Sequence, residues 1–208
     1  MQLAALMINP RTLQVEPGSE FNVMMRPLDI DDEDYMSKHR DTIEWHANLK
    51  SCTAEQIVEA WKKAPMQKDA FNMFKDYLLR HHTKAKRKSH FSAPVAAGYN
   101  IEGFDNIIIR RMCEAYGGLN KKGEVSLFHC RDQIDGMRLV LNWFENSDEL
   151  SSYSMDSVRE LLGMPSDDAH DALQDVRDTA WVITSFIKLH RRFAEQVTFK
   201  GSFNENIL

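Results

Sequence analysis

One short stretch near the C-terminus carries residues whose types and spacing are suited to chemistry. His170 and Asp175 stand in the segment A-H-D-A-L-Q-D-V, which has the form H-x-A-x-x-D. On an ideal helix of about 3.6 residues per turn these two side chains would lie about 140° apart. We therefore expect His170 in the first turn or the preceding loop, with Asp175 reaching the same place from one turn further in.

The same stretch gathers negative charge. Asp171, Asp175 and Asp178 would share one helix face, where like charges repel each other. Arg177 lies on another face, so a bound metal ion is a candidate counter-charge. The alternative is an ordinary helix start, because carboxylates favour the positive end of the helix dipole, with Asp168 as its cap.

The elements that must position these residues can be predicted from the spacing of apolar residues. Strands are expected at 2–9 and 21–25, then helices, then alternating strand and helix, which indicates an α/β fold with a mixed sheet flanked by helices. The helices are expected near 53–64, 69–80, 104–116, 132–144, 154–162 and 168–192, and the later strands at 94–99 and 124–130. We interpret residues 1–208 as one domain whose last part, 193–208, is loosely held.

Composition excludes several classes of protein. The net charge of −5 argues against a protein that coats nucleic acid through general basicity, but not against a nuclease that relies on bound metal. Three widely spaced cysteines form no zinc motif or disulfide framework, which favours a reducing, cytoplasmic location. No apolar run approaches the ~18 residues of a membrane span. The basic cluster at 83–90 is either a phosphate contact or an exposed loop.

A second motif lies at a predicted junction between a strand and a helix. The segment G-Y-N-I-E-G-F-D ends at Asp105, which would stand at the C-terminal end of a strand. Open α/β sheets bind their ligands at this end. The alternative role for Asp105 is a helix cap.

Together, G-Y-N-x-x-x-F-D and the later A-H-D-A-x-x-D-V resemble the exonuclease domain of bacterial exonuclease I, within the DEDDh 3′-to-5′ exonucleases. Residues 2–6, 131–138 and 154–163 also resemble stretches of that domain. The resemblance implies a ribonuclease H-like fold, with two divalent ions, Mg²⁺ or Mn²⁺, held by four carboxylates. Two cations about 4 Å apart would activate water and stabilise the leaving oxygen. The implied partner is single-stranded nucleic acid with a free 3′ end.

Roles follow by position in the two motifs. The resemblance implies that Asp175 binds the metal that holds the attacking water, that Asp105 serves the second metal, and that His170 takes the proton of the water. Asn100 and Phe104 would shape the junction on the side of the substrate without taking part in the chemistry.

The family's first motif, D-x-E on a first strand, is absent from the printed sequence. Asp32 and Asp34 alternate suitably but fall in a predicted loop. We therefore expect a sheet that lacks its first strand, and explain this by a native start further upstream, a strand from a partner, or a rearranged sheet. The function that the resemblance implies for the intact protein is a 3′-to-5′ exonuclease that hydrolyses single-stranded DNA to 5′-mononucleotides, with RNA as an open alternative substrate. We expect little or no activity from these 208 residues. The alternative is a non-catalytic domain that binds nucleic-acid ends or a partner protein.

Overall fold

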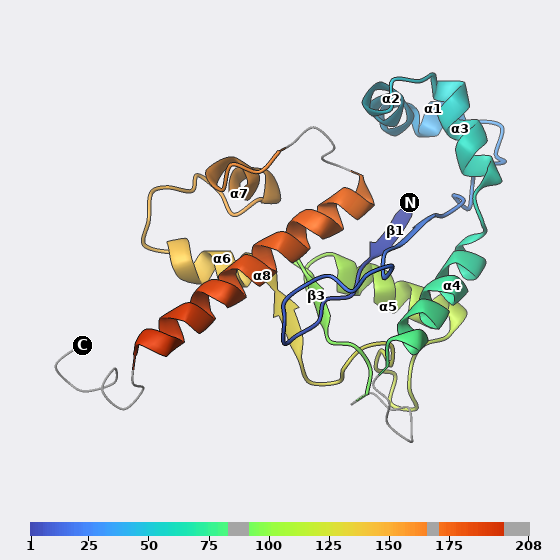
Figure 1. The fold of residues 1–208 in the computed structure, drawn as a ribbon. Helices are drawn as coiled ribbons and strands as arrows, with labels where there is room; N and C mark the ends of the chain where they lie inside the picture. Colours follow the sequence, from blue (N-terminus) through green and yellow to red (C-terminus); the bar gives the residue numbers. More distant parts are fainter. Residues whose placement is uncertain (83–91, 166–170, 198–208) are drawn as a thin grey trace. The chain divides into compact units, whose positions relative to one another are not determined.

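The computed structural model describes residues 1–82, 92–165 and 171–197 (Figure 1). The chain divides into two compact units. The first unit is formed by Met1–Ala5, Glu20–Pro94 and Arg111–Cys130, and the second by Leu6–Ser19, Val95–Arg110 and Arg131–Leu208. The predicted α/β class is confirmed, but the strands of the described residues form two separate two-stranded sheets rather than one mixed sheet.

The first unit begins with an antiparallel pair of strands. β1 (Gln2–Ala5) runs against β2 (Phe21–Met24), with Leu3 opposite Val23. Both strands lie within the ranges predicted from the sequence. The second strand continues the pattern of alternating burial, since Val23 and Met25 are buried.

Most of the remaining first unit consists of four helices. They are α1 (Tyr35–Lys38), α2 (Arg40–Leu49), α3 (Ala54–Lys63) and α4 (Gln67–Arg80). The side chain of Thr53 accepts a hydrogen bond from the amide of Gln56, whose own side chain accepts one from the amide of Thr53. This reciprocal pair is a capping box, and it starts α3 at the beginning of the helix expected near 53–64.

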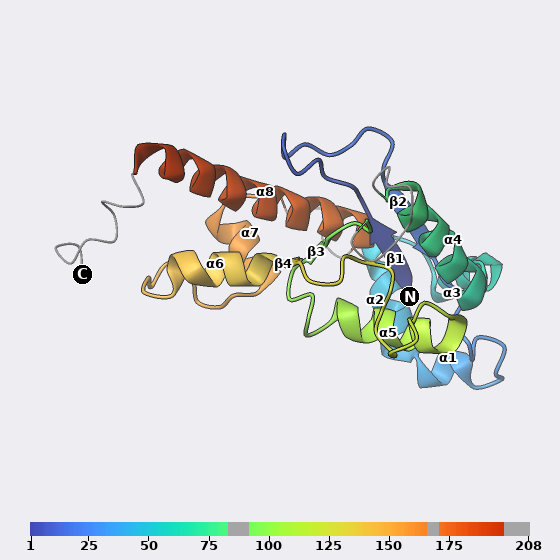
Figure 2. The ribbon, with the colours of Figure 1, turned by 90° about the horizontal axis from the view of Figure 1, so that it is seen from below.

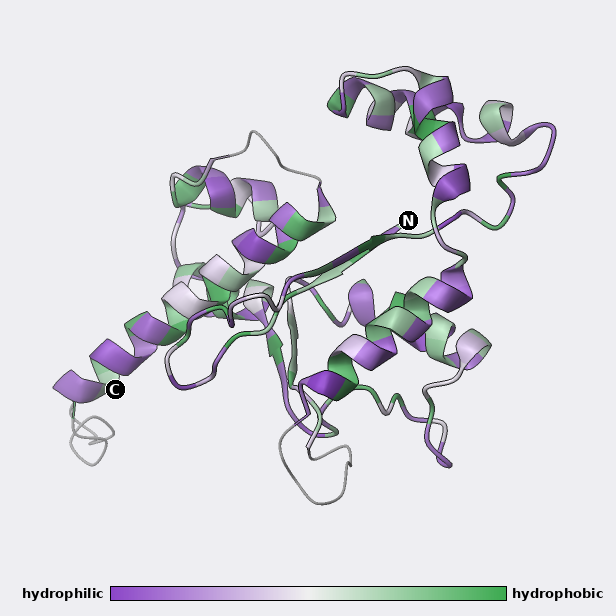
Figure 3. Cartoon of the chain, turned by 45° about the vertical axis from the view of Figure 1, so that its right-hand side comes forward, coloured by the Kyte–Doolittle hydropathy of each residue, from purple (hydrophilic) through white to green (hydrophobic). Residues whose placement is uncertain are grey.

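Helix α4 is amphipathic, and bands of hydrophilic and hydrophobic residues alternate along it in Figure 3. Its buried face contains aromatic and apolar residues three or four positions apart, the spacing expected of one face of a helix: Phe71, Phe74, Tyr77 and Leu78. A separate core lies between α1, α2 and α3, where Ile43 and Trp61 are almost fully buried.

Helix α5 (Asp105–Tyr116) ends at the predicted residue 116, directly before Gly117 and Gly118. Nζ of Lys75 in α4 donates hydrogen bonds to the carbonyls of Tyr116 and Gly117, at 3.0 and 3.3 Å. Gly118 has a φ of 148°, and a Cβ there would lie 2.8 Å from Sγ of Cys113. Burial, assisted by the Glu114 carboxylate, raises the pKa of the Cys113 thiol to about 11, against the opposing charge of Lys75.

The strand predicted at 124–130 is wrong. The only pairing there among the described residues is an isolated bridge between Leu119 and Val125. Oδ1 of Asn120 accepts hydrogen bonds from the amides of Lys122 and Glu124, at 2.8 and 3.0 Å. Asparagine side chains that bind the backbone in this way favour a turn over an extended strand.

The second unit contains a parallel pair of strands. β3 (Ala96–Gly98) pairs with β4 (Gln133–Asp135), with Gly98 opposite Asp135. Helix α6 (Gly136–Phe144) follows β4 without a loop. The helix expected from residue 132 therefore begins four positions later than predicted, because residues 133–135 pair with β3 instead.

Helices α7 (Met155–Leu161) and α8 (Ala172–Gln196) complete the second unit, and both α6 and α7 lie beside α8 (Figure 2). Their shared core contains Val140, Val158, Val182 and Phe186. The cap of α8 is Asp171, whose carboxylate accepts a hydrogen bond from the amide of Leu173 at 3.0 Å. The prediction of Asp168 as the cap is therefore wrong, and the helix continues past its predicted end at 192. No helix of the described ranges is both long and apolar enough to cross a membrane.

Candidate functional site

The junction between β3 and α5 is a tight turn that depends on Asn100. This residue has a φ of 54°, in the left-handed region that asparagine tolerates better than most residues. Its carbonyl accepts hydrogen bonds from the amides of Gly103 and Phe104, both at 3.1 Å. A Cβ at residue 103 would lie 2.6 Å from Oδ1 of Asn100. The asparagine and the glycine of the second motif are therefore needed to bring the chain from the strand into the helix.

Asp135 fastens this turn to the next element. Its Oδ1 accepts hydrogen bonds from the amide of Asn100 at 2.9 Å and from the amide of Met137 at 3.0 Å. One carboxylate therefore caps α6 and also holds the turn after β3. Sequence reasoning did not assign Asp135 a role, although an acid directly before a helix is a recognisable capping signal.

Asp105 is the first residue of α5 and is exposed to solvent. Neighbouring protein atoms nonetheless desolvate its carboxylate and raise its pKa, and the Asp135 carboxylate acts in the same direction, while a backbone hydrogen bond opposes them. Phe104 beside it is 63% exposed. The turn thus presents a carboxylate and an uncovered aromatic ring next to each other in the chain.

A polar chain joins β4 to the start of α5. Nδ2 of Asn106 donates a hydrogen bond of 2.7 Å to Oε1 of Gln133, and Nε2 of Gln133 donates one of 3.3 Å to Oε1 of Glu102. These exposed contacts and the Asp135 bonds hold the same segment from two directions. Asp105 therefore stands on a turn that is tied to the neighbouring strand.

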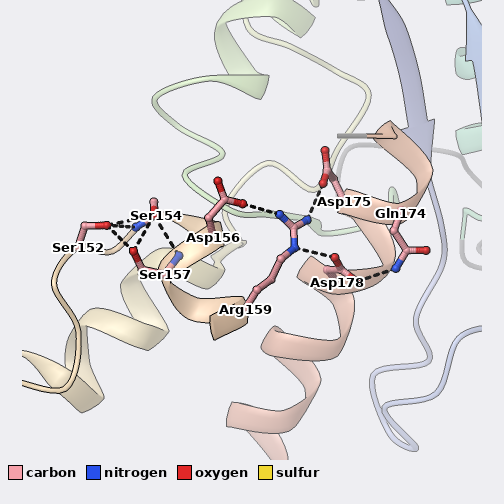
Figure 4. A network of polar contacts seen from close by, with 8 residues as sticks. All are labelled: Ser152, Ser154, Asp156, Ser157, Arg159, Gln174, Asp175 and Asp178. Atoms are coloured by element: carbon pink, nitrogen blue, oxygen red, sulfur yellow. Dashed lines mark hydrogen bonds and ion pairs between the residues drawn. The ribbon is translucent and has the colours of Figure 1, made fainter. Parts of the chain in front are cut away.

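The other predicted acid, Asp175, lies in the first turn of α8 and contacts an arginine of α7. Nη2 of Arg159 donates a hydrogen bond to Oδ1 of Asp175 at 2.6 Å (Figure 4). The same guanidinium binds Asp178 through Nε at 2.8 Å and Asp156 through Nη1 at 2.9 Å. Oδ1 of Asp178 also accepts a hydrogen bond of 2.7 Å from Gln174.

Arg159 supplies a counter-charge that sequence reasoning missed. Its side chain is 4% exposed, compared with 9% for Asp178, 43% for Asp175 and 70% for Asp156. Burial opposes the charge of the guanidinium, but the hydrogen bonds to Asp175 and Asp178 outweigh this and raise the pKa of Arg159. A guanidinium therefore occupies the side of Asp175 and Asp178 for which the sequence suggested a metal ion. Three carboxylates around one guanidinium still leave an excess of negative charge.

The remaining predicted residue, His170, lies outside the described residues. Asp105, Asp175, Asn100 and Phe104 all belong to the second unit. The structure thus assigns these four residues to one compact unit, although they come from segments about seventy positions apart in the sequence.

The chemistry of the donors can be compared with that of a divalent cation. Carboxylate oxygens, as in Asp105 and Asp175, suit Mg²⁺ or Mn²⁺. Burial raises the pKa of Asp105, and a surplus of carboxylates surrounds Arg159, so at both places a nearby cation would stabilise the charged carboxylate. Within the described ranges, however, no three His, Cys, Asp or Glu side chains lie close enough together to hold a metal ion. The described donors fit the ion in type and supply part of a ligand set.

These observations describe an α/β protein whose second unit contains both Asp105 and the carboxylates around Arg159. No family of known proteins matches the sequence, and no curated protein matches it. Among solved structures, the chain is similar to one described as "3'-end specific recognition of histone mRNA stem-loop by 3'-exonuclease". The two share 13% sequence identity with a TM-score of 0.49, over 93% of this chain and 72% of that chain. We therefore interpret the site from its own residues.

Proposed function

We propose that the chain is a metal-dependent 3′-to-5′ exonuclease domain of the DEDDh type, with a ribonuclease H-like fold, that releases 5′-mononucleotides from single-stranded nucleic acid. One observation carries the proposal. Asp105 and Asp175, the two acids of the resemblance to exonuclease I, stand at the starts of two helices in the same compact unit. Each carboxylate is at least partly open to solvent.

Each residue has a role in this proposal. Asp105 and Asp175 bind metal, and His170 accepts the proton of the attacking water. Divalent ions bound there would supply an activated water and charge stabilisation for the leaving oxygen. Asn100 and Asp135 hold the turn that presents Asp105. Phe104, being exposed, offers a ring face on which a terminal base can stack.

A second function is favoured by the contact between Arg159 and Asp175. A carboxylate already paired with a guanidinium attracts a cation less strongly. In addition, no three His, Cys, Asp or Glu side chains of the described residues come together to hold a metal ion. The second proposal is a non-catalytic domain that binds nucleic-acid 3′ ends or a partner protein. Both proposals place the ligand at the same residues and differ in whether a bond is broken.

The test is a paired assay on 3′-labelled single-stranded DNA and RNA, with Mg²⁺ or Mn²⁺, that measures release of label and retention of the strand. The variants are Asp105→Asn and Asp175→Asn. Asp156→Asn is the matched control, since it changes a neighbouring acid that is mostly exposed and stands on α7. We expect slow metal-dependent release, because the 208 residues supply only two of the four carboxylates that the resemblance implies.

The outcomes separate the two functions. Release that needs metal and is lost in both Asn variants, but kept in Asp156→Asn, supports the exonuclease. Retention of strands with a free 3′ end, without release under any metal condition, supports the binding domain. A chain that neither releases label nor retains the strand would contradict a role at nucleic-acid ends.

A further inference from the structure

The last part of α8 concentrates positive charge on an exposed stretch of helix. Lys188, Arg191 and Arg192 all lie on the surface. We propose that residues 188–193, which we name the basic end of α8, are a contact surface for a single nucleic-acid strand. This inference rests on the proposed function only for the class of partner, and the surface contains none of the residues assigned above to the chemistry.

No carboxylate of the described residues forms an ion pair with these cations. The sequence has no acid between Asp178 and Glu195, and within the described ranges neither Lys188 nor Arg192 takes part in an ion pair. Glu195 lies about one turn beyond Arg192. A chain with a net charge of −5 therefore carries a local excess of positive charge at this place, and a polyanion is the complementary partner.

Stabilisation by the helix dipole does not account for this charge. The dipole favours cations in the last turn of a helix, because its effect falls off quickly away from the end. The last turn of α8, which ends at Gln196, contains no basic residue. Lys188 stands about two turns before that end. The basic end of α8 therefore lies before the part of the helix that the dipole would stabilise.

A loop of the same unit adds a further cation. Nη1 of Arg191 donates a hydrogen bond of 2.8 Å to the carbonyl of Arg11, and Nη2 donates one of 2.7 Å to the carbonyl of Pro10. Arg11 and Arg191 are 180 positions apart in the sequence, so the fold brings them together. The exposed side chain of Arg11 thereby adds its charge to the basic end of α8.

A basic row and an apolar row run side by side on this stretch of helix. Lys188 and Arg192 are four positions apart and share one face, while Leu189 and Phe193 share the next, about 100° further round. Both apolar side chains are open to solvent, Leu189 by 43% and Phe193 by 58%. The phosphates of a strand can follow the basic row while its bases lie against the apolar row.

Trp143 of α6 adds an aromatic ring that is held in place. Its Nε1 donates a hydrogen bond of 3.2 Å to Nε2 of His190, and the centroids of the two rings are 5.4 Å apart. The tryptophan is nonetheless 40% exposed. Bases stack on aromatic side chains, and a single strand offers free base faces for this. Positive charge together with exposed rings therefore favours a single strand over a duplex or an acidic peptide.

The experiment measures binding of the full chain to a fluorescent oligothymidylate by anisotropy, at several salt concentrations. Divalent ions are left out so that the strand is not cleaved. A linear strand is compared with a covalently closed circle of the same length, because the circle has no 3′ end. A duplex and a labelled polyglutamate test the other two kinds of polyanion.

The charge variant is the double substitution Lys188→Gln, Arg192→Gln, which leaves the contacts with the loop in place. Phe193→Ala removes an exposed ring and tests stacking. The matched control is Lys121→Gln, Lys122→Gln, which makes the same change of charge at an exposed turn of the first unit.

We expect the original chain to bind both the circle and the linear strand, with an affinity that falls as salt rises. Each phosphate contact with a single strand contributes about −0.7 to the slope of log affinity against log salt. The charge variant should therefore lose about 1.4 from the magnitude of this slope, whereas the lysine control should keep it. Phe193→Ala should weaken binding by about fivefold or more without changing the slope, because stacking releases no counterions.

Several results would overturn the inference. These are an unchanged slope in the charge variant, an equal loss in the lysine control, no binding of the circle by the original chain, or a preference for the duplex or for polyglutamate. The proposed function is judged separately. Equal affinity for the circle and the linear strand, together with the expected slopes, would contradict recognition of 3′ ends and support the basic end of α8.

Discussion

Nε of Arg159 donates a hydrogen bond of 2.8 Å to Oδ2 of Asp178, and both side chains are nearly withdrawn from solvent. The two residues are 19 positions apart, and their contact ties α7 to α8. Arg159 thereby neutralises part of the negative charge at the start of α8, and the stability of the second unit should depend strongly on this pair.

Replacement of Arg159 by Met should lower the free energy of unfolding by about 3–5 kcal/mol, because the buried carboxylate of Asp178 then loses its charged partner and keeps only the hydrogen bond from Gln174. Urea unfolding followed by circular dichroism measures the change. Asp156→Asn removes a mostly exposed partner and should cost about 0–1 kcal/mol. The double variant Arg159→Met, Asp178→Leu should recover part of the loss, since both charges are then gone. A double variant no more stable than Arg159→Met would argue against this explanation.

Asp135→Ala should destabilise the second unit by about 1–3 kcal/mol, because the amides of Asn100 and Met137 both lose a charged acceptor. Asp135→Asn should cost less, since an amide oxygen remains. Thermal or urea unfolding gives the free energies, and the amide chemical shift of Asn100 gives the local readout. An Asn100 signal unchanged in Asp135→Ala would show that the turn does not depend on this carboxylate.

Thr53→Ala should lower the free energy of unfolding of the first unit by about 1 kcal/mol through loss of the capping box at α3. Thr53→Ser keeps the hydroxyl and should remain close to the original stability. The two variants are compared by urea unfolding under identical conditions. Equal stability of the alanine and serine variants would mean that the cap contributes little.

Acidification should destabilise the first unit through His46. Burial, with help from Lys50 and the N-terminus, lowers the pKa of His46 below its ordinary 6.5. Between the folded and unfolded pKa values the unfolded chain binds more protons, so this contribution to stability is complete above ~6.5 and is lost as the pH falls through the folded value. Urea unfolding at several pH values should show that the free energy of unfolding decreases as the pH falls in this range. His46→Gln should make this decrease smaller.

The same histidine offers an optical measurement. The ring of His46 lies 4.7 Å from that of Trp45 and 5.3 Å from that of Trp61, between centroids. Protonation of the imidazole should quench tryptophan fluorescence in the folded chain, with a midpoint below the ordinary histidine pKa of 6.5. A fluorescence titration midpoint at or above 6.5 would contradict the lowered pKa.

The parts of the fold that could be predicted from the sequence depend on local spacing. The capping box at Thr53, the buried face of α4 and the turn at Asn100 each involve residues within a few positions of one another. Secondary structure of this kind is determined by near neighbours, so a single sequence is sufficient to recognise it.

The parts that could not be predicted depend on partners distant in sequence. The pairing of Arg159 with Asp175 joins residues 16 positions apart on two helices, and helix periodicity does not indicate which residues meet across helices. Helix α6 begins at residue 136, later than predicted, because the residues before it form β4 and pair with β3. The paired residues Ala96 and Gln133 are 37 positions apart in the sequence. The strand expected at 124–130 does not form, because the side chain of Asn120 binds the amides of Lys122 and Glu124 and stabilises a turn there.

The close approach of Gly118 to Cys113 has a consequence for thiol chemistry. Cys113 is 1% exposed with a pKa raised to about 11, whereas Cys130 is exposed. Because the thiolate is the reactive form, Cys130 should react with an alkylating reagent at once, and Cys113 only when the end of α5 opens. The rate at which Cys113 is modified therefore measures local opening of the first unit while the rest of the protein stays folded.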